Sequence, residues 1–379
     1  MARFLLSAAD LAYRAARPLV FTMDAQAAHD LFVRVMRVGD SAGIFPAMAR
    51  VMRRAVESGT APVTAGGVSL PSTVMIAAGL VKGDGFADED AALRAVEAGR
   101  NIIPGWRLMP ALCGAVEFGS YTRWPRLGNP GRVIWRDAGA RSTQNRVGLK
   151  NPGARAAAAF LAAHKQDLPD VFGLNVAVSP GVADPAQERD EAAEAFSFFV
   201  AAGLTPAWFT LNVSCPNTED DPRGHQTRDR TRALCQAVGA VIGGHGPLWL
   251  KISPDLGDAQ LAALVETCAE TGVRALVTTN TLGQPAPSDP SLTAGVGGGR
   301  LHPAALDTCQ RIAHLRDQTD APLDIIGCGG ALDGAAAHDF MQAGASAVQL
   351  YSALIYRGLL AASIVSHELD LQAKLHQDA

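Results

Sequence analysis

Short apolar runs alternate with helical stretches along the chain from about residue 62 onward. Eight runs have the length and composition of buried strands, and the stretches between them, such as 259–271 and 335–343, have helical spacing. The runs are 74–79, 115–120, 173–178, 208–213, 248–252, 275–279, 324–327 and 347–351. Strands that alternate with helices predict a parallel sheet, and eight of them close a (β/α)8 TIM barrel. A doubly wound open sheet is the alternative, but no G-x-G-x-x-G follows the first run.

The beginning of the chain has a different pattern. Apolar residues recur at helical spacing over 4–12 and 27–36, so we expect two short amphipathic helices separated near Pro18. Residues 1–55 hold eight Arg and four Asp, a net charge of +4, and the rest of the chain carries −8. We therefore expect a helical extension, residues 1–60, on a barrel of residues 61–379. The extension is either a cap docked on the barrel or a helix pair in a lipid interface, with Arg facing anionic headgroups.

Composition excludes several classes of protein. With 379 residues, 48% hydrophobic and 18% charged, the chain is too apolar for disorder. A net charge of −4 argues against nucleic acid as the main partner. No apolar run reaches the roughly 18 to 20 residues of a membrane-spanning helix. The six cysteines form no C-x-x-C pair, which argues against a metal or iron–sulfur site and for a reducing compartment.

Polar residues and glycines follow the expected strands. The carboxyl ends of barrel strands and their loops form one rim, where the chemistry of such folds gathers. The residues at these ends are Gly79 to Lys82, Ser120, Asn175, Asn212, Thr279 to Thr281, Gly329, Gly330, Tyr351 and Ser352, with Lys251 inside the fifth run. The backbone N–H groups of Gly329 and Gly330, with Tyr351 and Ser352, suit a phosphate site after the last two strands, although a glycine pair also serves as a plain tight turn.

Lys251 and Cys215 are the candidate reactive groups. An ammonium in an apolar strand is costly unless it is paired, so Lys251 is a Schiff-base nucleophile, a fixed cation beside a ligand that gains negative charge, or a lysine paired with a barrel carboxylate. Cys215 lies in an Asn-rich loop after the fourth run, where a thiol of lowered pKa can act as a general base. We expect Cys113, Cys235, Cys268 and Cys309 to be small core side chains.

Six motifs together resemble the dihydroorotate dehydrogenases. They are Asn145-Arg-Val-Gly148, Asn212-Val-Ser-Cys-Pro-Asn-Thr218, Leu250-Lys-Ile-Ser-Pro-Asp-Leu256, Thr279-Asn-Thr281, Ile326-Gly-Cys-Gly-Gly330 and Gly344-Ala-Ser-Ala-Val-Gln-Leu-Tyr-Ser352. The likeness runs from about residue 60 to the end of the chain. The helical extension, with Met23-Asp-Ala-Gln-Ala-Ala-His29 before an apolar helix, looks like that of the class 2, membrane-associated branch.

The resemblance implies an FMN-dependent barrel that oxidises dihydroorotate to orotate in pyrimidine synthesis and passes electrons to a quinone. A base removes a proton from C5 while a hydride passes from C6 to flavin N5. By motif position Cys215 is that base, and Lys251 stabilises negative charge on the reduced flavin. The implied substrate residues are Lys82, Asn145, Asn212, Asn217, Asn280 and Thr281. The implied FMN residues are Ala78, Gly79, Ser120, Asn175, Lys251, Thr279, Gly299, Gly329, Gly330, Tyr351 and Ser352.

The resemblance also implies a location and has departures. Residues 1–55 would make peripheral contact with the cytoplasmic face of the cell membrane. Class 2 members use serine as the base, whereas Cys215 is typical of the soluble class 1 enzymes. Val81 replaces an acidic residue, Leu149-Lys150 replaces an aromatic-Asn pair, 297–300 lacks the usual Ser, and the acidic 219–221 stands in place of a small Gly-containing loop. Residues 101–113 look like an insertion.

These departures leave other functions open. A paralogous flavin oxidoreductase would act on another cyclic amide or imide. A non-redox phosphate-binding barrel would use Lys251 as a Schiff-base nucleophile. A catalytically inactive barrel would serve as a scaffold at a membrane surface.

Overall fold

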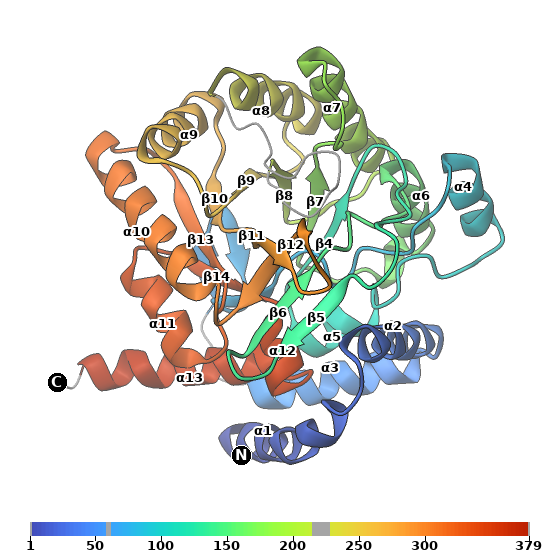
Figure 1. Ribbon diagram of the computed structural model, residues 1–379, viewed down its shortest axis with the longest axis vertical. Helices are drawn as coiled ribbons and strands as arrows, with labels where there is room; N and C mark the ends of the chain where they lie inside the picture. Colours follow the sequence, from blue (N-terminus) through green and yellow to red (C-terminus); the bar gives the residue numbers. More distant parts are fainter. Residues whose placement is uncertain (1, 58–61, 214–227, 378–379) are drawn as a thin grey trace.

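Eight parallel strands close into a barrel in the computed structural model, which describes residues 2–57, 62–213 and 228–377 (Figure 1). The strand order is β10-β13-β14-β3-β4-β7-β8-β9. The strands are β3 (Val74–Ile76), β4 (Val116–Tyr121), β7 (Phe172–Ala177), β8 (Trp208–Asn212), β9 (Leu248–Ile252), β10 (Ala275–Thr278), β13 (Asp324–Cys328) and β14 (Ala347–Leu350). Each of the eight predicted runs overlaps one of them, so the predicted (β/α)8 barrel is confirmed.

Helices surround the barrel (Figure 1). They are α4 (Glu89–Glu97), α5 (Leu108–Cys113), α6 (Ala154–Ala163), α7 (Pro185–Ala201), α8 (Arg228–Ile242), α9 (Asp258–Thr271), α10 (His302–Thr319), α11 (Gly334–Gln342), α12 (Ser352–Arg357) and α13 (Ala361–Gln377), with a 3-10 turn at Lys165–Asp167. The side chains of Asp88, Asp184 and Asp333 each accept a hydrogen bond from a backbone N–H at the start of a helix. Such caps satisfy donors that have no partner inside the helix, and so fix where it begins.

A four-stranded antiparallel sheet lies over the mouth of the barrel. Its order is β11 (Leu282–Ala286), β12 (Asp289–Gly298), β6 (Ser142–Asn145) and β5 (Ile134–Asp137). β5 and β6 follow the second barrel strand in the chain. The hairpin β11–β12 was not predicted, and its pairing of Gly295 with Asn145 helps hold Asn145 at the barrel mouth.

Two tryptophans fill the opposite end of the barrel. The Trp208 and Trp249 rings stack with centroids 4.7 Å apart, and both side chains are fully buried. A hairpin of β1 (Val63–Ala65) and β2 (Val68–Leu70) covers them, because the Trp249 indole N–H donates to the Gly66 carbonyl at 2.9 Å. The tryptophans and this hairpin close the amino-terminal end of the barrel. The rim at the strand carboxyl ends is therefore the end that opens toward solvent.

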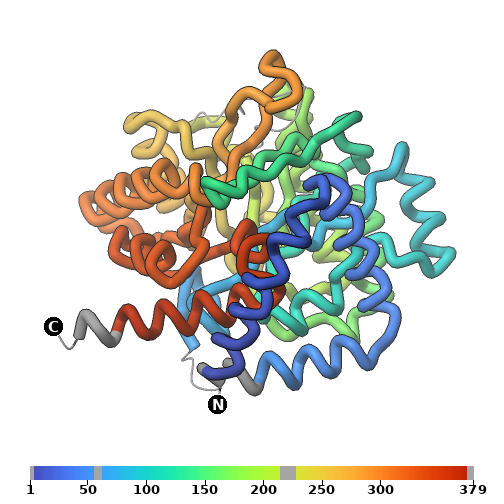
Figure 2. Tube along the Cα trace, turned by 60° about the horizontal axis from the view of Figure 1, so that its bottom comes forward, coloured from blue at the N-terminus to red at the C-terminus, as the bar shows by residue number. Residues whose placement is uncertain are grey.

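The helical extension contains three helices, α1 (Ala2–Val20), α2 (Ala25–Ser41) and α3 (Ile44–Glu57) (Figure 2). The two predicted helices are confirmed as α1 and α2, whereas α3 was not predicted and the predicted separation near Pro18 was wrong. Pro18 lies in the last turn of α1, where the helix ends anyway two residues later. The break comes instead before Asp24, whose carboxylate accepts from the N–H groups of Gln26 and Ala27 to start α2.

The extension is docked on the barrel by buried apolar and polar contacts. Leu6, Met36 and Ala49 are buried. Asp40 on α2 accepts from the side chain of Asn101 at 2.8 Å and from the N–H groups of Gly105 at 2.6 Å, Arg107 at 3.2 Å and Leu108 at 2.9 Å. Burial raises the pKa of Asp40, against the opposite effect of these bonds. The segment 101–113, expected as an insertion, is thereby held against α2.

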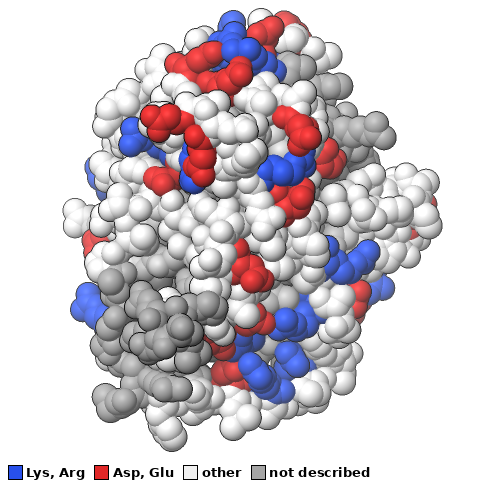
Figure 3. Space-filling view, turned by 90° about the vertical axis from the view of Figure 1, so that its left-hand side faces the viewer, with Lys and Arg blue, Asp and Glu red and all other residues white. Residues whose placement is uncertain are grey.

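Surface charge is mostly paired on the face that carries α9, α10 and α11. Figure 3 shows basic and acidic side chains interspersed there, and among them Arg311 bonds Asp258 at 2.5 Å and Arg316 bonds Asp317 at 2.8 Å. No helix within 2–57, 62–213 and 228–377 is both long and apolar enough to cross a bilayer.

We predict that Gly173→Ala destabilises the barrel floor. A Cβ at Gly173 would lie 2.1 Å from the Trp208 indole, and overpacking of a dense core costs about 1–3 kcal/mol. Gly239→Ala on α8 is the matched control, because nothing lies within 4 Å of its Cβ position and alanine favours a helix by about 1 kcal/mol. Denaturant unfolding measures both, and equal stability of the two variants would contradict the prediction.

Candidate active site

A single cavity of about 550 Å³ joins the carboxyl ends of the barrel strands to the helical extension. Fourteen of the residues predicted from sequence line it. They are Ala78, Gly79, Lys82, Ser120, Asn145, Asn212, Lys251, Thr279, Asn280, Thr281, Gly329, Gly330, Tyr351 and Ser352. Residues from eight separate segments thus meet because barrel closure brings all strand ends to one rim.

Lys251 lies at the polar bottom of the cavity, inside the barrel. Its side chain is 4% exposed, and its ammonium donates to Cys328 Sγ at 3.7 Å. Burial raises the pKa of the Cys328 thiol, and the Lys251 charge opposes that shift. Nearby on the rim, Asn212 donates from Nδ2 to Ser120 Oγ at 3.2 Å. A fixed cation and a fixed amide therefore face the same space.

A buried carboxylate, Glu117, forms hydrogen bonds inside the barrel beneath the cavity. Glu117 is fully buried and accepts from Trp208 Nε1 at 3.0 Å, from the Thr210 hydroxyl, and from Gln349 Nε2 at 3.3 Å. The Ala78 N–H also lies 3.4 Å from Glu117 Oε2. A buried polar network of this kind stabilises one side-chain arrangement, because breaking any member leaves a desolvated group without a partner.

The buried side-chain amides of Asn175 and Gln349 have polar atoms that find no hydrogen-bond partner within the described residues. These atoms are Nδ2 and Oδ1 of Asn175 and Oε1 of Gln349. Gln349 lines the cavity, and Asn175 lies fully buried on β7, opposite Thr210 in register. Since buried polar groups in folded proteins are hydrogen-bonded, the Gln349 Oε1 atom at the cavity is a position where a ligand with a hydrogen-bond donor would be held.

Glycines and hydroxyls line the end of the cavity beside β13 and β14. A Cβ at Gly330 would lie 2.6 Å from the Gly298 carbonyl oxygen, so only glycine lets the two backbones approach. Beside them, Thr143 Oγ1 and Ser352 Oγ are 3.3 Å apart. Gly299 does not line the cavity, because it packs against the Ala140 carbonyl; Gly297 and Gly298 take its place.

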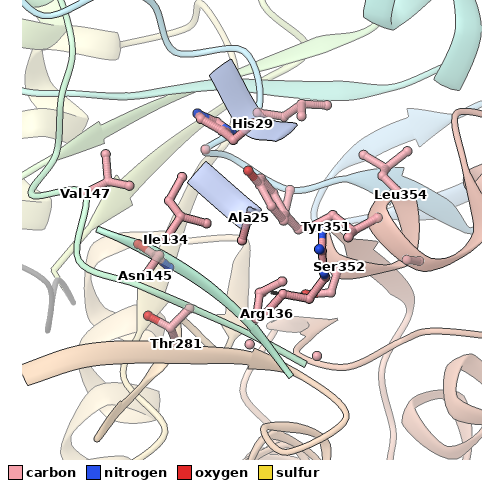
Figure 4. A pocket seen from close by; sticks show the side chains of 18 of the residues that line it. Ala25, His29, Ile134, Arg136, Asn145, Val147, Thr281, Tyr351, Ser352 and Leu354 are labelled. Atoms are coloured by element: carbon pink, nitrogen blue, oxygen red, sulfur yellow. Dashed lines mark hydrogen bonds between the residues drawn. The ribbon is translucent and has the colours of Figure 1, made fainter. Parts of the chain in front are cut away.

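The other end of the cavity is apolar and runs beneath α2. Figure 4 shows Ala25 and His29 of α2 facing Ile134, Asn145 and Leu354 across this space. Further lining residues are Phe21, Leu31, Phe32, Val35 and Leu359.

Arg136 of β5 holds the turn between α1 and α2. It donates to the carbonyls of Phe21 at 3.1 Å and Met23 at 2.8 Å, and its guanidinium lies 4.0 Å from the centre of the Phe21 ring. The apolar channel is thus a joint product of the extension and the barrel.

Two of the predicted site residues, Cys215 and Asn217, lie outside the described residues. Cys113, Cys235, Cys268 and Cys309 are buried and form no disulfide bond within the described residues, as expected for core side chains. Within the described parts of the chain no group of His, Cys, Asp and Glu has the arrangement of a metal site.

The chain matches a family model described as "Dihydroorotate dehydrogenase" over residues 107–372. The chain belongs to the dihydroorotate dehydrogenase family. It is 34% identical over 354 residues to a protein of Salinispora arenicola named dihydroorotate dehydrogenase (quinone), which covers 91% of this chain and 95% of the relative. A relative of Cereibacter sphaeroides with the same name is 32% identical, covering 94% and 92% of the two chains.

A solved dihydroorotate dehydrogenase of Eimeria tenella shares the fold. Its complex with ferulenol superposes with a TM-score of 0.71 at 24% identity and covers 95% of this chain and 97% of that one. The relatives leave at most 9% of this chain unmatched, which is less than the helical extension, so the similarity reaches into the extension as well as the barrel. The predicted family is confirmed.

Sequence reasoning missed many of the lining residues, and the ones with the most distinctive side chains include His29, Arg136, Thr143, Cys328 and Gln349. Gln349 and Cys328 stood inside the quoted motifs, and His29 ended the quoted stretch before α2, so motif membership was a usable signal for these three. Arg136 and Thr143 gave no local signal, since only the docking of β5 and β6 over the rim brings them to the cavity.

We predict that His29 destabilises the protein in acid. Burial lowers the pKa of His29 to about 4, and the charge of Lys82 adds to that shift. An unfolded histidine titrates near pH 6.5, so between about pH 6.5 and 4 the unfolded chain binds more protons and stability falls as pH falls. His29→Gln should lose less stability than wild type across this window in thermal unfolding, and parallel profiles would contradict the assignment.

Proposed function

We propose that this chain oxidises dihydroorotate to orotate with bound FMN and passes the electrons to a quinone. The observation that carries the proposal is the continuity of one cavity from a polar floor at the strand ends to an apolar channel beneath α2. A polar ring substrate and an apolar electron acceptor need these two environments within reach of one redox group. The names of the relatives support the same activity.

The residues present fit FMN. The orphaned atoms of Asn175 and Gln349 suit the amide-bearing edge of an isoalloxazine. The close glycine backbones at 298 and 330, with the Ser352 hydroxyl, suit a phosphate at the far end. Ala78, Gly79, Ser120 and Thr279 would form walls between these two ends.

FMN, when bound, supplies the hydride acceptor for C6 of the substrate. Lys82 would hold the substrate carboxylate, and the amides of Asn145, Asn212 and Asn280 would fix the ring by hydrogen bonds. Thr281 and Asn217 complete the proposed substrate set. Cys215 would remove the C5 proton as general base. Lys251, held against Cys328, would place a cation where negative charge develops.

The helical extension would bind a membrane surface and admit the quinone. Of the exposed large hydrophobic side chains in the described parts, all but Trp124, Leu127 and Leu359 belong to it. Phe4 and Leu11 of α1 and Val51 of α3 are each at least 70% exposed. Apolar side chains on helices with a basic net charge suit a lipid interface with anionic headgroups. We propose that residues 1–60 form this membrane unit at the cytoplasmic face, and that residues 61–379 form the catalytic barrel.

We predict that the purified protein is yellow and bleaches when dihydroorotate is added without oxygen. Cys215→Ala should slow this bleaching by at least about a hundredfold, the usual minimum for loss of a general base. Cys215→Ser should retain more activity but show its onset at higher pH, because a hydroxyl has a far higher pKa than a thiol. Stopped-flow absorbance measures both.

A yellow protein that ignores dihydroorotate would favour another cyclic amide or imide as substrate. A colourless protein in which borohydride traps a carbonyl substrate on Lys251 would favour Schiff-base chemistry instead.

We predict that Ala28→Phe blocks the apolar channel. Ala28 lines the channel, so a phenyl ring there should lower quinone-linked turnover severalfold while flavin reduction by dihydroorotate keeps its rate. Ala27→Phe is the matched control, because Ala27 is exposed on the same helix and does not line the channel. Equal quinone turnover in the two variants would place the quinone elsewhere.

A further inference from the structure

We propose that Arg357 and Asp10 are positioning residues that couple the docking of helix α1 to the phosphate end of the cavity, so that FMN binding and α1 docking stabilise each other. The inference rests on the proposed FMN site. Arg357 and Asp10 do not line the cavity, and neither was among the predicted site residues.

All five N–H donors of Arg357 are used in a buried cluster. The side chain is 3% exposed, and Nε and Nη2 donate to the Asp10 carboxylate at 2.8 and 3.0 Å. Nη2 and Nη1 also donate to the Glu368 carboxylate at 2.6 and 3.2 Å, and Nη1 to the Leu332 carbonyl at 3.3 Å. A guanidinium with every donor satisfied has one favoured position, and loss of any acceptor leaves a buried donor without a partner.

The cluster joins the two segments that form the phosphate end. Arg357 is the last residue of α12, which begins at Ser352. Leu332 lies two residues beyond Gly330 and itself lines the cavity. Glu368 of α13 accepts from the Gly334 N–H at 2.8 Å, just after Leu332. The guanidinium therefore fixes the segment after β13 relative to the segment after β14.

Helix α1 supplies the remaining acceptor and further bonds to α12. Tyr13 donates its hydroxyl to the Ile355 carbonyl at 2.7 Å, and Arg17 donates from Nη1 to the Tyr356 carbonyl at 3.0 Å. These carbonyls belong to the last turn of a short helix, where no partner exists within the helix. Figure 2 shows α1 running beside α12 and α13, far from them in the sequence.

The coupling follows from these contacts. If α1 leaves, Arg357 loses one of its two carboxylates and the last turn of α12 loses two donors, so Ser352 and the segment after Gly330 become less constrained. A ligand that needs Ser352 and Gly330 in place must then restore that order on binding. Thermodynamic linkage makes the effect reciprocal, so bound FMN must favour docked α1 by the same factor.

The test measures FMN affinity and α1 docking in the full-length protein after removal of FMN. Asp10→Asn should weaken FMN binding, titrated by quenching of flavin fluorescence, by about fivefold or more, the lower bound of usual coupling between sites. Glu188→Gln is the matched control. It disrupts another buried arginine–carboxylate pair, Arg230 with Glu188, which links α7 to α8 away from the phosphate end. It should lower stability and leave FMN affinity unchanged.

A second measurement needs no variant. Amide hydrogen exchange over residues 2–20 of wild type should slow by the same factor when FMN is added. Equal FMN affinity of Asp10→Asn and wild type, or exchange in α1 that ignores FMN, would overturn the coupling while leaving the flavin site intact. A wild-type protein that binds no FMN at all would instead overturn the proposed function.

Discussion

Closure of the eight-stranded barrel is the constraint on which the rest of the structure depends. Parallel strands that close in one sheet must end on the same rim, so residues as distant in sequence as Gly79 and Ser352 line one cavity. The stacked tryptophans fill the other end of the interior, so the cavity opens at the end where the strand carboxyl ends lie. A change that opened the barrel would scatter every candidate ligand contact at once.

The polar layer inside the barrel explains how a charged site survives in an apolar core. Glu117 and Lys251 would each be costly to bury alone. Hydrogen bonds to Glu117 from the indole of Trp208 and from the Gln349 amide offset this cost and fix Gln349 beneath the cavity. The Oε1 atom of Gln349 keeps no partner in the described residues and faces the cavity, where a ligand could donate to it. The site is preorganised by the same bonds that stabilise the interior.

Much of the fold could be predicted because barrel strands are buried on both faces and therefore appear as continuous apolar runs. The helical extension was harder, since Pro18 suggests a break that the chain does not make there. Pro18 lies in the last turn of α1, two residues before its end. Pro46 lies in the first turn of α3, where a missing N–H costs little. The hairpin β11–β12 has few apolar residues and is stabilised by pairing with β6, which no local pattern shows.

The candidate site could be predicted where the chemistry lies at strand ends, and only there. Gly330 follows an apolar run, and Asn212 and Lys251 lie near the carboxyl ends of two others, so the rim rule finds them without any structure. His29 and Arg136 reach the cavity through the docking of separate elements, which depends on contacts between residues more than a hundred positions apart. The roles of Cys215 and Asn217 remain predictions from motif position.

The helical extension does two things at opposite ends of the same cavity. Helix α2 and the turn before it form one wall of the apolar channel, whereas α1 reaches α12 beside the proposed phosphate end. Arg136 anchors the turn and Arg357 anchors the helix, so the extension is held to two different parts of the barrel. A membrane surface that binds the extension, as proposed above, would therefore act on both ends of the cavity through ordinary hydrogen bonds, because the same bonds constrain the segments after β13 and β14.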